Sequence, residues 1–121
     1  MQSAPHRVLI VDDNRPAADL MAMLISHKGH IVERAYDGET ALSAASEFNP
    51  DIVLLDLVMP DMDGFAVARR LRDMYGSNPP KIVALTAFDQ PAFIEATAAA
   101  GFDGHIGKPA SAEAIAKVLA G

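Results

Sequence analysis

The stretch IVLLDLVMPDMDG, residues 52–64, joins an uninterrupted apolar run to an aspartate and then to a loop rich in acidic residues. Such a run is typical of a strand in a parallel sheet, which is buried on both of its faces. Asp56 follows directly, at the point where this strand would end, and Asp63-Gly64 can begin a helix. The stretch therefore predicts a buried strand that carries a carboxylate at its carboxyl end.

Short apolar runs recur on both sides of this stretch, and helical patterns separate them. The further strands are expected at Val8–Val11, Ile31–Tyr36, Lys81–Leu85 and around Ile106. The helices are expected to begin near Asn14, Asp37, Asp63, Pro91 and Ser111. Alternation of this kind implies a parallel sheet covered by helices, with right-handed crossovers. We therefore predict an α/β, flavodoxin-like doubly wound (βα)5 fold with a five-stranded parallel sheet in the order 2-1-3-4-5.

The composition narrows the class of protein. A chain of 121 residues has room for one domain, so we expect a single domain over residues 1–121 with its core at about 7–119. The absence of cysteine excludes a disulfide framework and a thiolate metal site. The net charge of -6 argues against direct binding of nucleic acid. The sequence has neither a secretory signal nor an apolar run of ~20 residues, so we expect a cytoplasmic protein that does not enter a membrane.

Acidic residues gather near the ends of two of the apolar runs, and we interpret this placement as functional rather than as solvated loop acids. These residues are Asp12, Asp13, Asp56, Asp61 and Asp63. Ligand sites of parallel sheets lie outside the carboxyl ends of the strands, at the switch point in strand order. Asp12, Asp13 and Asp56 are therefore expected to share one pocket, with Thr86 after the fourth strand and Lys108 after the fifth beside them.

Carboxylates that share a pocket repel one another, and a divalent cation would relieve this repulsion. Mg2+ prefers oxygen ligands and keeps waters that a phosphate oxygen can displace. The ammonium of Lys108 and the hydroxyl of Thr86 could hold other oxygens of a phosphoryl group. A carboxylate such as that of Asp56 can act as the nucleophile and form an aspartyl phosphate.

Four motifs occur in order along the chain: VLIVDDN (residues 8–14), VLLDLVMPDMDG (53–64), ALTA (84–87) and GFDGHIGKP (101–109). Together they resemble the receiver domain of bacterial two-component systems, from about Arg7 to Leu119. Similar receivers include the chemotaxis response regulator and those of hybrid histidine kinases. The resemblance implies a signalling switch rather than an enzyme. Its phosphoryl group would come from a sensor histidine kinase or a histidine phosphotransfer protein.

The resemblance also implies a role for each matching position. Asp56 would be the phosphoacceptor, and Mg2+ would be bound by Asp12, Asp13, Asp56 and the backbone carbonyl of Val58. Thr86 and Lys108 would hold phosphate oxygens, Ala87 would leave space for the phosphoryl group, and Lys108–Pro109 would be a cis peptide. His105 stands where the family usually has a Tyr or Phe that switches together with Thr86. It could equally be a half-buried strand histidine with no such role.

The same resemblance places the phosphodonor near Arg15, Pro16 and Leu20, and the downstream target on the 91–120 face of a monomer or weak dimer. Val58 and Phe88 lie where family members control access of water to the phosphoryl group. Both are apolar, which predicts slow loss of phosphate. Six further residues are expected to have ordinary roles: Met21, Met23 and Met59 in core or loop packing, and His6, His27 and His30 on the surface.

Three other functions are compatible with the architecture but fit the residues less well. A flavodoxin-like cofactor binder would need donor-rich loops, whereas Asp12-Asp13 would repel a flavin phosphate. An aspartate-nucleophile phosphatase would need an acid at Val58. A pseudo-receiver would not need the full set of acids, Thr86 and Lys108. The motifs do not distinguish a stand-alone regulator from a receiver within a longer protein.

Overall fold

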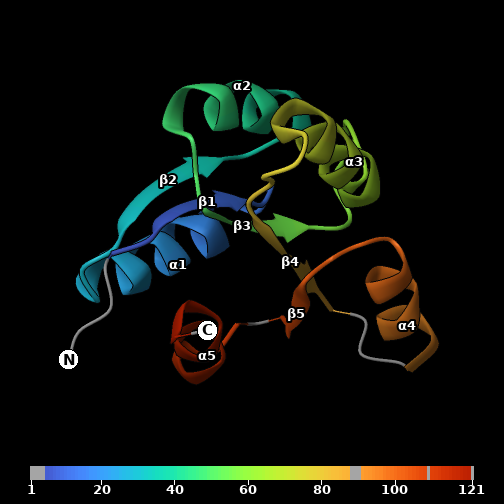
Figure 1. Cartoon of the computed structure of the whole chain (residues 1–121). Coiled ribbons are helices and arrows are strands. Elements are labelled where there is room, and N and C mark those ends of the chain that lie inside the picture. Colours follow the sequence, from blue (N-terminus) through green and yellow to red (C-terminus); the bar gives the residue numbers. More distant parts are fainter. Residues whose placement is uncertain (1–4, 88–90, 109, 121) are drawn as a thin grey trace.

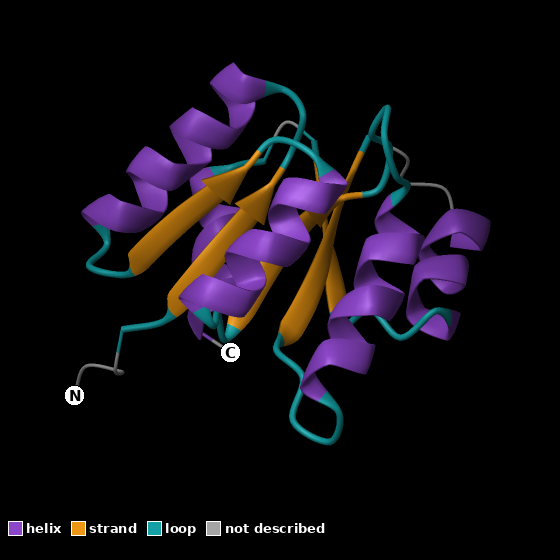
Figure 2. Ribbon diagram, turned by 90° about the horizontal axis from the view of Figure 1, so that it is seen from above, coloured by secondary structure: helices purple, strands orange, loops and turns teal. Residues whose placement is uncertain are grey.

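The computed structural model describes residues 5–87, 91–108 and 110–120 (Figure 1). Within them lies a five-stranded parallel sheet in the order β2-β1-β3-β4-β5, which confirms the predicted topology. Figure 2 shows the strands running in the same direction, so that their carboxyl ends meet at one edge. The strands are β1 (Arg7–Val11), β2 (Ile31–Ala35), β3 (Ile52–Asp56), β4 (Lys81–Thr86) and β5 (Gly104–Gly107).

Helices cover both faces of the sheet. They are α1 (Arg15–His27), α2 (Gly38–Phe48), α3 (Gly64–Tyr75), α4 (Pro91–Ala99) and α5 (Ala112–Ala120). The buried side chains of α2 and α3 pack on one face, and those of α1 and α5 pack on the other (Figure 1). Consecutive residues of β3 point to opposite faces of the sheet: Val53 packs with α2 and α3, and Leu54 packs with α1 and α5. This two-sided burial explains why β3 is uninterruptedly apolar before Asp56.

Four helices begin at the capping side chains that were expected from the sequence. Asn14 Oδ1 accepts a hydrogen bond from Ala17 N–H at 3.1 Å, and Asp37 Oδ1 accepts one from Thr40 N–H at 2.7 Å. Asp63 and Ser111 cap α3 and α5 in the same way, at 2.8 and 3.0 Å. Each cap satisfies an N–H that has no partner within its helix. The predicted starts of these helices are therefore confirmed.

Some predictions about individual side chains are wrong. Met21 and Met59 are buried as expected, but Met23 is 69% exposed and does not pack in the core. His27 is exposed as expected, whereas His6 and His30 are half-buried and stack on each other with their ring centroids 5.3 Å apart. The ring of His6 also contacts the Asp51 carboxylate at 3.0 Å and the Leu119 carbonyl at 2.9 Å. His6 therefore ties β1 to the end of α5, at the edge of the sheet opposite the acidic residues.

None of the helices in the described part of the chain is both long and apolar enough to cross a membrane.

Gly64, the first residue of α3, lies against the backbone that carries Asp56. A Cβ at this position would lie 2.6 Å from the carbonyl oxygen of Asp56 and 2.7 Å from the Cα of Leu57. Because backbone atoms cannot move aside like a side chain, we expect Gly64→Ala to lower the free energy of unfolding by about 1–3 kcal/mol. Urea denaturation would measure this loss. Gly104→Ala is the matched control, since a Cβ there would meet no atom within 4 Å. Equal stability of the two variants would contradict the prediction.

Candidate functional site

Three carboxylates converge at the carboxyl ends of β1 and β3. The two strands pair directly, with Val11 opposite Leu55, so that Asp12 and Asp56 follow at neighbouring positions. Asp12 is fully buried and Asp56 is 5% exposed, while Asp13 is exposed. Each of these aspartates offers an oxygen, and the three oxygens lie within 4.8 Å of one another. The predicted acidic pocket is therefore present.

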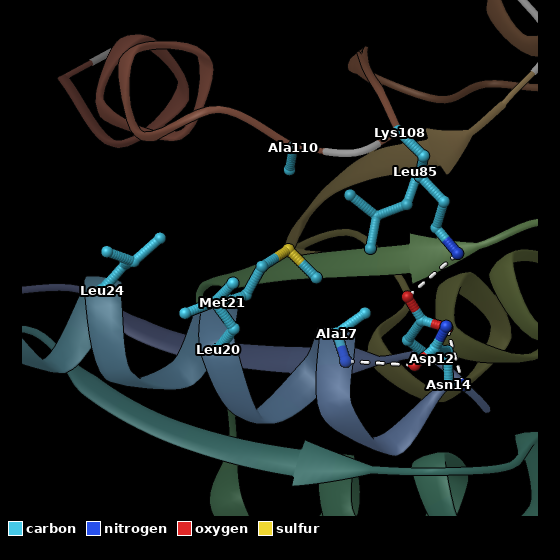
Figure 3. A pocket seen from close by; sticks show the side chains of 9 residues that line it. All are labelled: Asp12, Asn14, Ala17, Leu20, Met21, Leu24, Leu85, Lys108 and Ala110. Atoms are coloured by element: carbon cyan, nitrogen blue, oxygen red, sulfur yellow. Dashed lines mark hydrogen bonds and ion pairs between the residues drawn. The ribbon is translucent and has the colours of Figure 1, made fainter.

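Lys108 reaches the pocket from the end of β5. Its Nζ lies 2.9 Å from Asp12 Oδ2 and 3.2 Å from Asp56 Oδ2. Figure 3 shows this ammonium pointing at Asp12. The backbone N–H of Lys108 donates a hydrogen bond to the carbonyl of Thr86 at 2.8 Å, which links the ends of β4 and β5. Lys108 is one positive charge facing three carboxylates, so the cluster keeps an excess of negative charge.

Backbone N–H groups orient the two buried carboxylates. Asn14 N–H donates to Asp12 Oδ1 at 3.0 Å, and Val58 N–H donates to Asp56 Oδ1 at 3.2 Å. In both aspartates the Oδ1 atom is held by the residue two positions later, and the Oδ2 atom faces Lys108. The orientation of both carboxylates is thus set by nearby backbone N–H groups before any ligand binds.

Burial is the main influence on Asp56, and it raises the pKa of this carboxyl group from the usual 3.8 to about 6. The Val58 N–H and the Lys108 ammonium act to lower that pKa, while the neighbouring Asp12 acts to raise it. Burial acts to lower the pKa of Lys108, but Asp12 and Asp56 outweigh burial, and the pKa of Lys108 is raised. The attraction of Lys108 therefore does not fully offset the free-energy cost of burying an ionised Asp56 carboxylate in this pocket.

The residues present suit a hard divalent cation. Asp12 Oδ2 is buried, and among the described residues its polar contact is the Lys108 ammonium at 2.9 Å, which leaves coordination capacity on that oxygen. The cluster offers only oxygen donors, which Mg2+ and Ca2+ prefer over softer ligands. The cluster could thus hold such an ion.

The other residues expected at the site lie around this pocket. Thr86 is 4% exposed and ends β4, one residue beyond the register partner of Asp56. Ala87 is exposed, and Val58 is 64% exposed. His105 is exposed on β5, so the half-buried position considered from the sequence is not observed. Phe88 and Pro109, and with them the expected cis peptide, lie outside the described residues.

Two of the five gathered aspartates have structural roles instead. Asp63 caps α3, and Asp61 accepts hydrogen bonds from the backbone N–H groups of Gly38 and Glu39 at the start of α2. The cap at Asp63 confirms the helix start expected at Asp63-Gly64, whereas the contact of Asp61 with α2 was not predicted from the sequence. A loop acid that caps a helix earlier in the chain leaves no local sequence signal.

Sequence reasoning also missed a groove beside the acidic pocket. A cavity of about 310 Å³ runs from Asp12 and Lys108 between α1 and the segment before α5 (Figure 3). Its apolar wall is formed by Ala17, Leu20, Met21, Leu24, Leu85 and Ala110. Leu20 on this wall is 57% exposed. The groove shows that the apolar surface of α1 extends beyond what the core needs.

The fold and the site together define a class of protein: a doubly wound α/β domain with an acid–lysine cluster at the carboxyl edge of its sheet. The family model of the response regulator receiver domain matches residues 8–120, and the chain belongs to this family. The family acts as a signalling switch of two-component systems.

Known relatives agree with this assignment. The chain is 39% identical over 111 residues to response regulator MprA of Mycolicibacterium vanbaalenii, covering 92% of this chain and 47% of MprA. It therefore spans about half the length of that relative. The structure of chemotaxis protein CheY4 of Vibrio cholerae superposes with a TM-score of 0.87 at 31% identity, covering 97% of this chain and 98% of that one. The receiver domain of the Francisella response regulator 1452 gives a TM-score of 0.85 at 25% identity, covering 95% and 93% of the two chains.

Replacing Asp56 by Asn should stabilise the protein when no divalent cation is present. Because folding raises the pKa of Asp56, the wild type loses stability as the pH rises through about 6, and the Asn variant does not share this loss. At neutral pH we expect the variant to gain about 1–3 kcal/mol in free energy of unfolding, since one pKa unit corresponds to ~1.36 kcal/mol. Urea denaturation in EDTA at several pH values would measure the difference, which should vanish below about 3.8.

Asp63→Asn is the control for this prediction, because Asp63 is an exposed aspartate on the same loop. Its substitution should bring no gain in stability. An Asp56→Asn variant that is no more stable than the wild type at neutral pH would show that burial does not disfavour the ionised carboxylate.

Proposed function

We propose that the chain is a receiver domain that accepts a phosphoryl group on Asp56 in a Mg2+-dependent phosphorelay. The observation that carries this proposal is the convergence of Asp12, Asp13 and Asp56 within 4.8 Å, with Lys108 in contact with the two buried members. Family membership supports the same reading. The excess negative charge of the cluster explains why a cation is needed before an anionic phosphoryl group can approach.

In this proposal Asp56 is the nucleophile. One of its oxygens forms a bond to the phosphorus of a phosphohistidine on the donor, while the bond between phosphorus and nitrogen breaks and the imidazole leaves. Mg2+, held by Asp12, Asp13, Asp56 and the carbonyl of Val58, would supply positive charge for the phosphoryl oxygens.

Lys108 and Thr86 bind the transferred group in the proposed product. Lys108 already lies 3.2 Å from Asp56 Oδ2, so its ammonium can move to a phosphoryl oxygen with little displacement. Thr86 lies at the end of the adjacent strand and offers a hydroxyl donor. Exposed Ala87 leaves the entrance free of a large side chain. Because Lys108 N–H also bonds the carbonyl of Thr86, a shift of either residue is transmitted between β4 and β5.

The partner in the proposed transfer is a sensor histidine kinase or a histidine phosphotransfer protein. The apolar groove along α1 opens directly beside Asp12 and Lys108, so a protein seated there would reach the acceptor. The exposed side chains of Leu20 and Met23 extend the apolar surface of α1. The output is proposed to act through the 91–120 face, on which His105 is exposed and could respond to movement of Thr86.

Acetyl phosphate provides a test that needs no protein partner. With Mg2+ present, the intact mass of the wild type should rise by one phosphoryl group, because a small donor can reach the pocket directly. Asp56→Asn should remain unmodified, and EDTA should abolish modification of the wild type. Asp63→Asn, which alters an exposed cap outside the pocket, should be modified like the wild type. Equal modification of Asp56→Asn and the wild type would refute Asp56 as acceptor.

The phosphorylated protein should lose its phosphate slowly, over hours rather than seconds. Val58 follows the acceptor by two residues, and its exposed isopropyl group has no atom that could orient an attacking water. We expect Val58→Gln to accelerate the loss about tenfold or more, because an amide can position that water. Val58→Ala is the control and should not accelerate it to the same extent. Phosphate release from the purified phosphoprotein measures the rate, and wild-type decay within seconds would disprove the prediction.

A further inference from the structure

The loop of residues 57–63, between β3 and α3, carries Val58 and is closed at its base by the backbone. Leu57 N–H donates to the carbonyl of Leu85 at 3.3 Å, and Gly64 N–H donates to the carbonyl of Leu57 at 2.9 Å. Between these points the side chain of Val58 is mostly exposed and does not anchor the loop. Buried Leu57 fixes the start of the loop, so the path of the backbone from Val58 onward depends on contacts made further along the loop.

Asp61 makes the polar contact of this loop with α2. Its Oδ1 and Oδ2 atoms accept hydrogen bonds from Gly38 N–H at 3.1 and 3.0 Å, and Oδ2 also accepts one from Glu39 N–H at 3.3 Å. These are N–H groups of the first turn, where the helix dipole favours a negative charge. The loop approaches closely, since a Cβ on Gly38 would lie 2.9 Å from the Cβ of Met62.

The helix does not need Asp61 in order to begin. Asp37 is the residue directly before α2, and its Oδ1 accepts a hydrogen bond from Thr40 N–H at 2.7 Å. Asp61 comes from 23 residues further along the chain than Gly38. Its hydrogen bonds therefore hold the loop to a helix that already has its own cap.

The buried side chains of the loop are apolar, and Leu57, which is 3% exposed, anchors its first residue in the core. Met59 is 8% exposed, and Met62 packs partly against the same core. Methionine side chains are flexible and fit many arrangements, so they hold the loop down without fixing where its backbone lies. The hydrogen bonds of Asp61 are directional, and their partner helix is anchored in the core by Ala41 and Ala45.

We infer that Asp61 is a positioning residue, which fastens the loop of residues 57–63 to the start of α2 and thereby holds the Val58 backbone beside Asp56. The Val58 N–H bonds Asp56 Oδ1 at 3.2 Å, so movement of the loop reaches the acceptor directly. The effect on the metal rests on the proposed function, in which the Val58 carbonyl is a Mg2+ ligand. Loss of Asp61 weakens Mg2+ binding by releasing that carbonyl, although Asp61 itself does not contact the ion.

The test compares Asp61→Ala with Asp37→Ala. Both substitutions remove a carboxylate from the start of the same helix, so both lower stability to a similar extent. Only Asp61→Ala should weaken Mg2+ binding, by about tenfold as for other residues that orient metal ligands. Isothermal titration of each metal-free protein with MgCl2 measures the affinity. Asp61→Asn keeps one acceptor oxygen, and it should restore part of the affinity.

Hydrogen–deuterium exchange without Mg2+ supplies a readout that does not depend on the metal. In Asp61→Ala the amides of residues 57–63 should exchange faster than in the wild type, while in Asp37→Ala they should not. Unchanged exchange in both Asp61 variants overturns the inference. If the wild type binds Mg2+ and the two variants Asp61→Ala and Asp37→Ala bind it with equal affinity, the inference is overturned as well. A wild type that fails to bind Mg2+ would refute the proposed function instead, and the exchange experiment would still decide the role of Asp61.

Discussion

Repulsion among the carboxylates of Asp12, Asp13 and Asp56 is the constraint on which this structure depends. Two of these groups are buried, and burial, with a smaller contribution from the charge of Asp12, raises the pKa of Asp56 to about 6. Lys108 offsets part of the repulsion through contacts of 2.9 and 3.2 Å, yet the cluster remains short of positive charge. The cluster could hold a cation, which would offset the remaining repulsion.

The rest of the fold serves to hold these charges together against their repulsion. Strands β1 and β3 pair in parallel and are buried on both faces by two layers of helices, so the ends that carry Asp12 and Asp56 cannot separate. Gly64 lets the start of α3 pack against the backbone of Asp56 itself. Local N–H groups then aim the carboxylates toward Lys108.

The site is connected to its surroundings through two different routes. Lys108 and Thr86 link it to β5 and β4 through a backbone hydrogen bond, which is the direction in which a downstream response is proposed. Asp61 links the loop beside the site to α2. The groove on α1 forms a third neighbour of the site and suits the approach of a protein donor. In the proposed function, uptake of a phosphoryl group and transmission of the signal would use separate surfaces.

The sequence by itself determined the order of the elements, the parallel sheet and the convergence of Asp12, Asp13, Asp56 and Lys108. These features follow from local signals, because apolar runs, capping residues and strand ends are each formed by residues close together in the sequence. The same reasoning identified the caps at Asn14 and Asp37. It wrongly expected Met23, which is exposed, to pack in the core or against a loop. Helical spacing alone does not say how wide the buried face of α1 is, since that depends on what packs against it.

Only the tertiary structure decided which acids belong to the site and which support it. Asp61 shares a short acidic stretch with Asp56, yet its carboxylate accepts hydrogen bonds from N–H groups at the start of α2. The contacts of His6 with Asp51 and Leu119 likewise join segments far apart in the chain. Such hydrogen bonds form only when the helix and sheet layers pack together. The periodicity of the sequence therefore does not predict their partners.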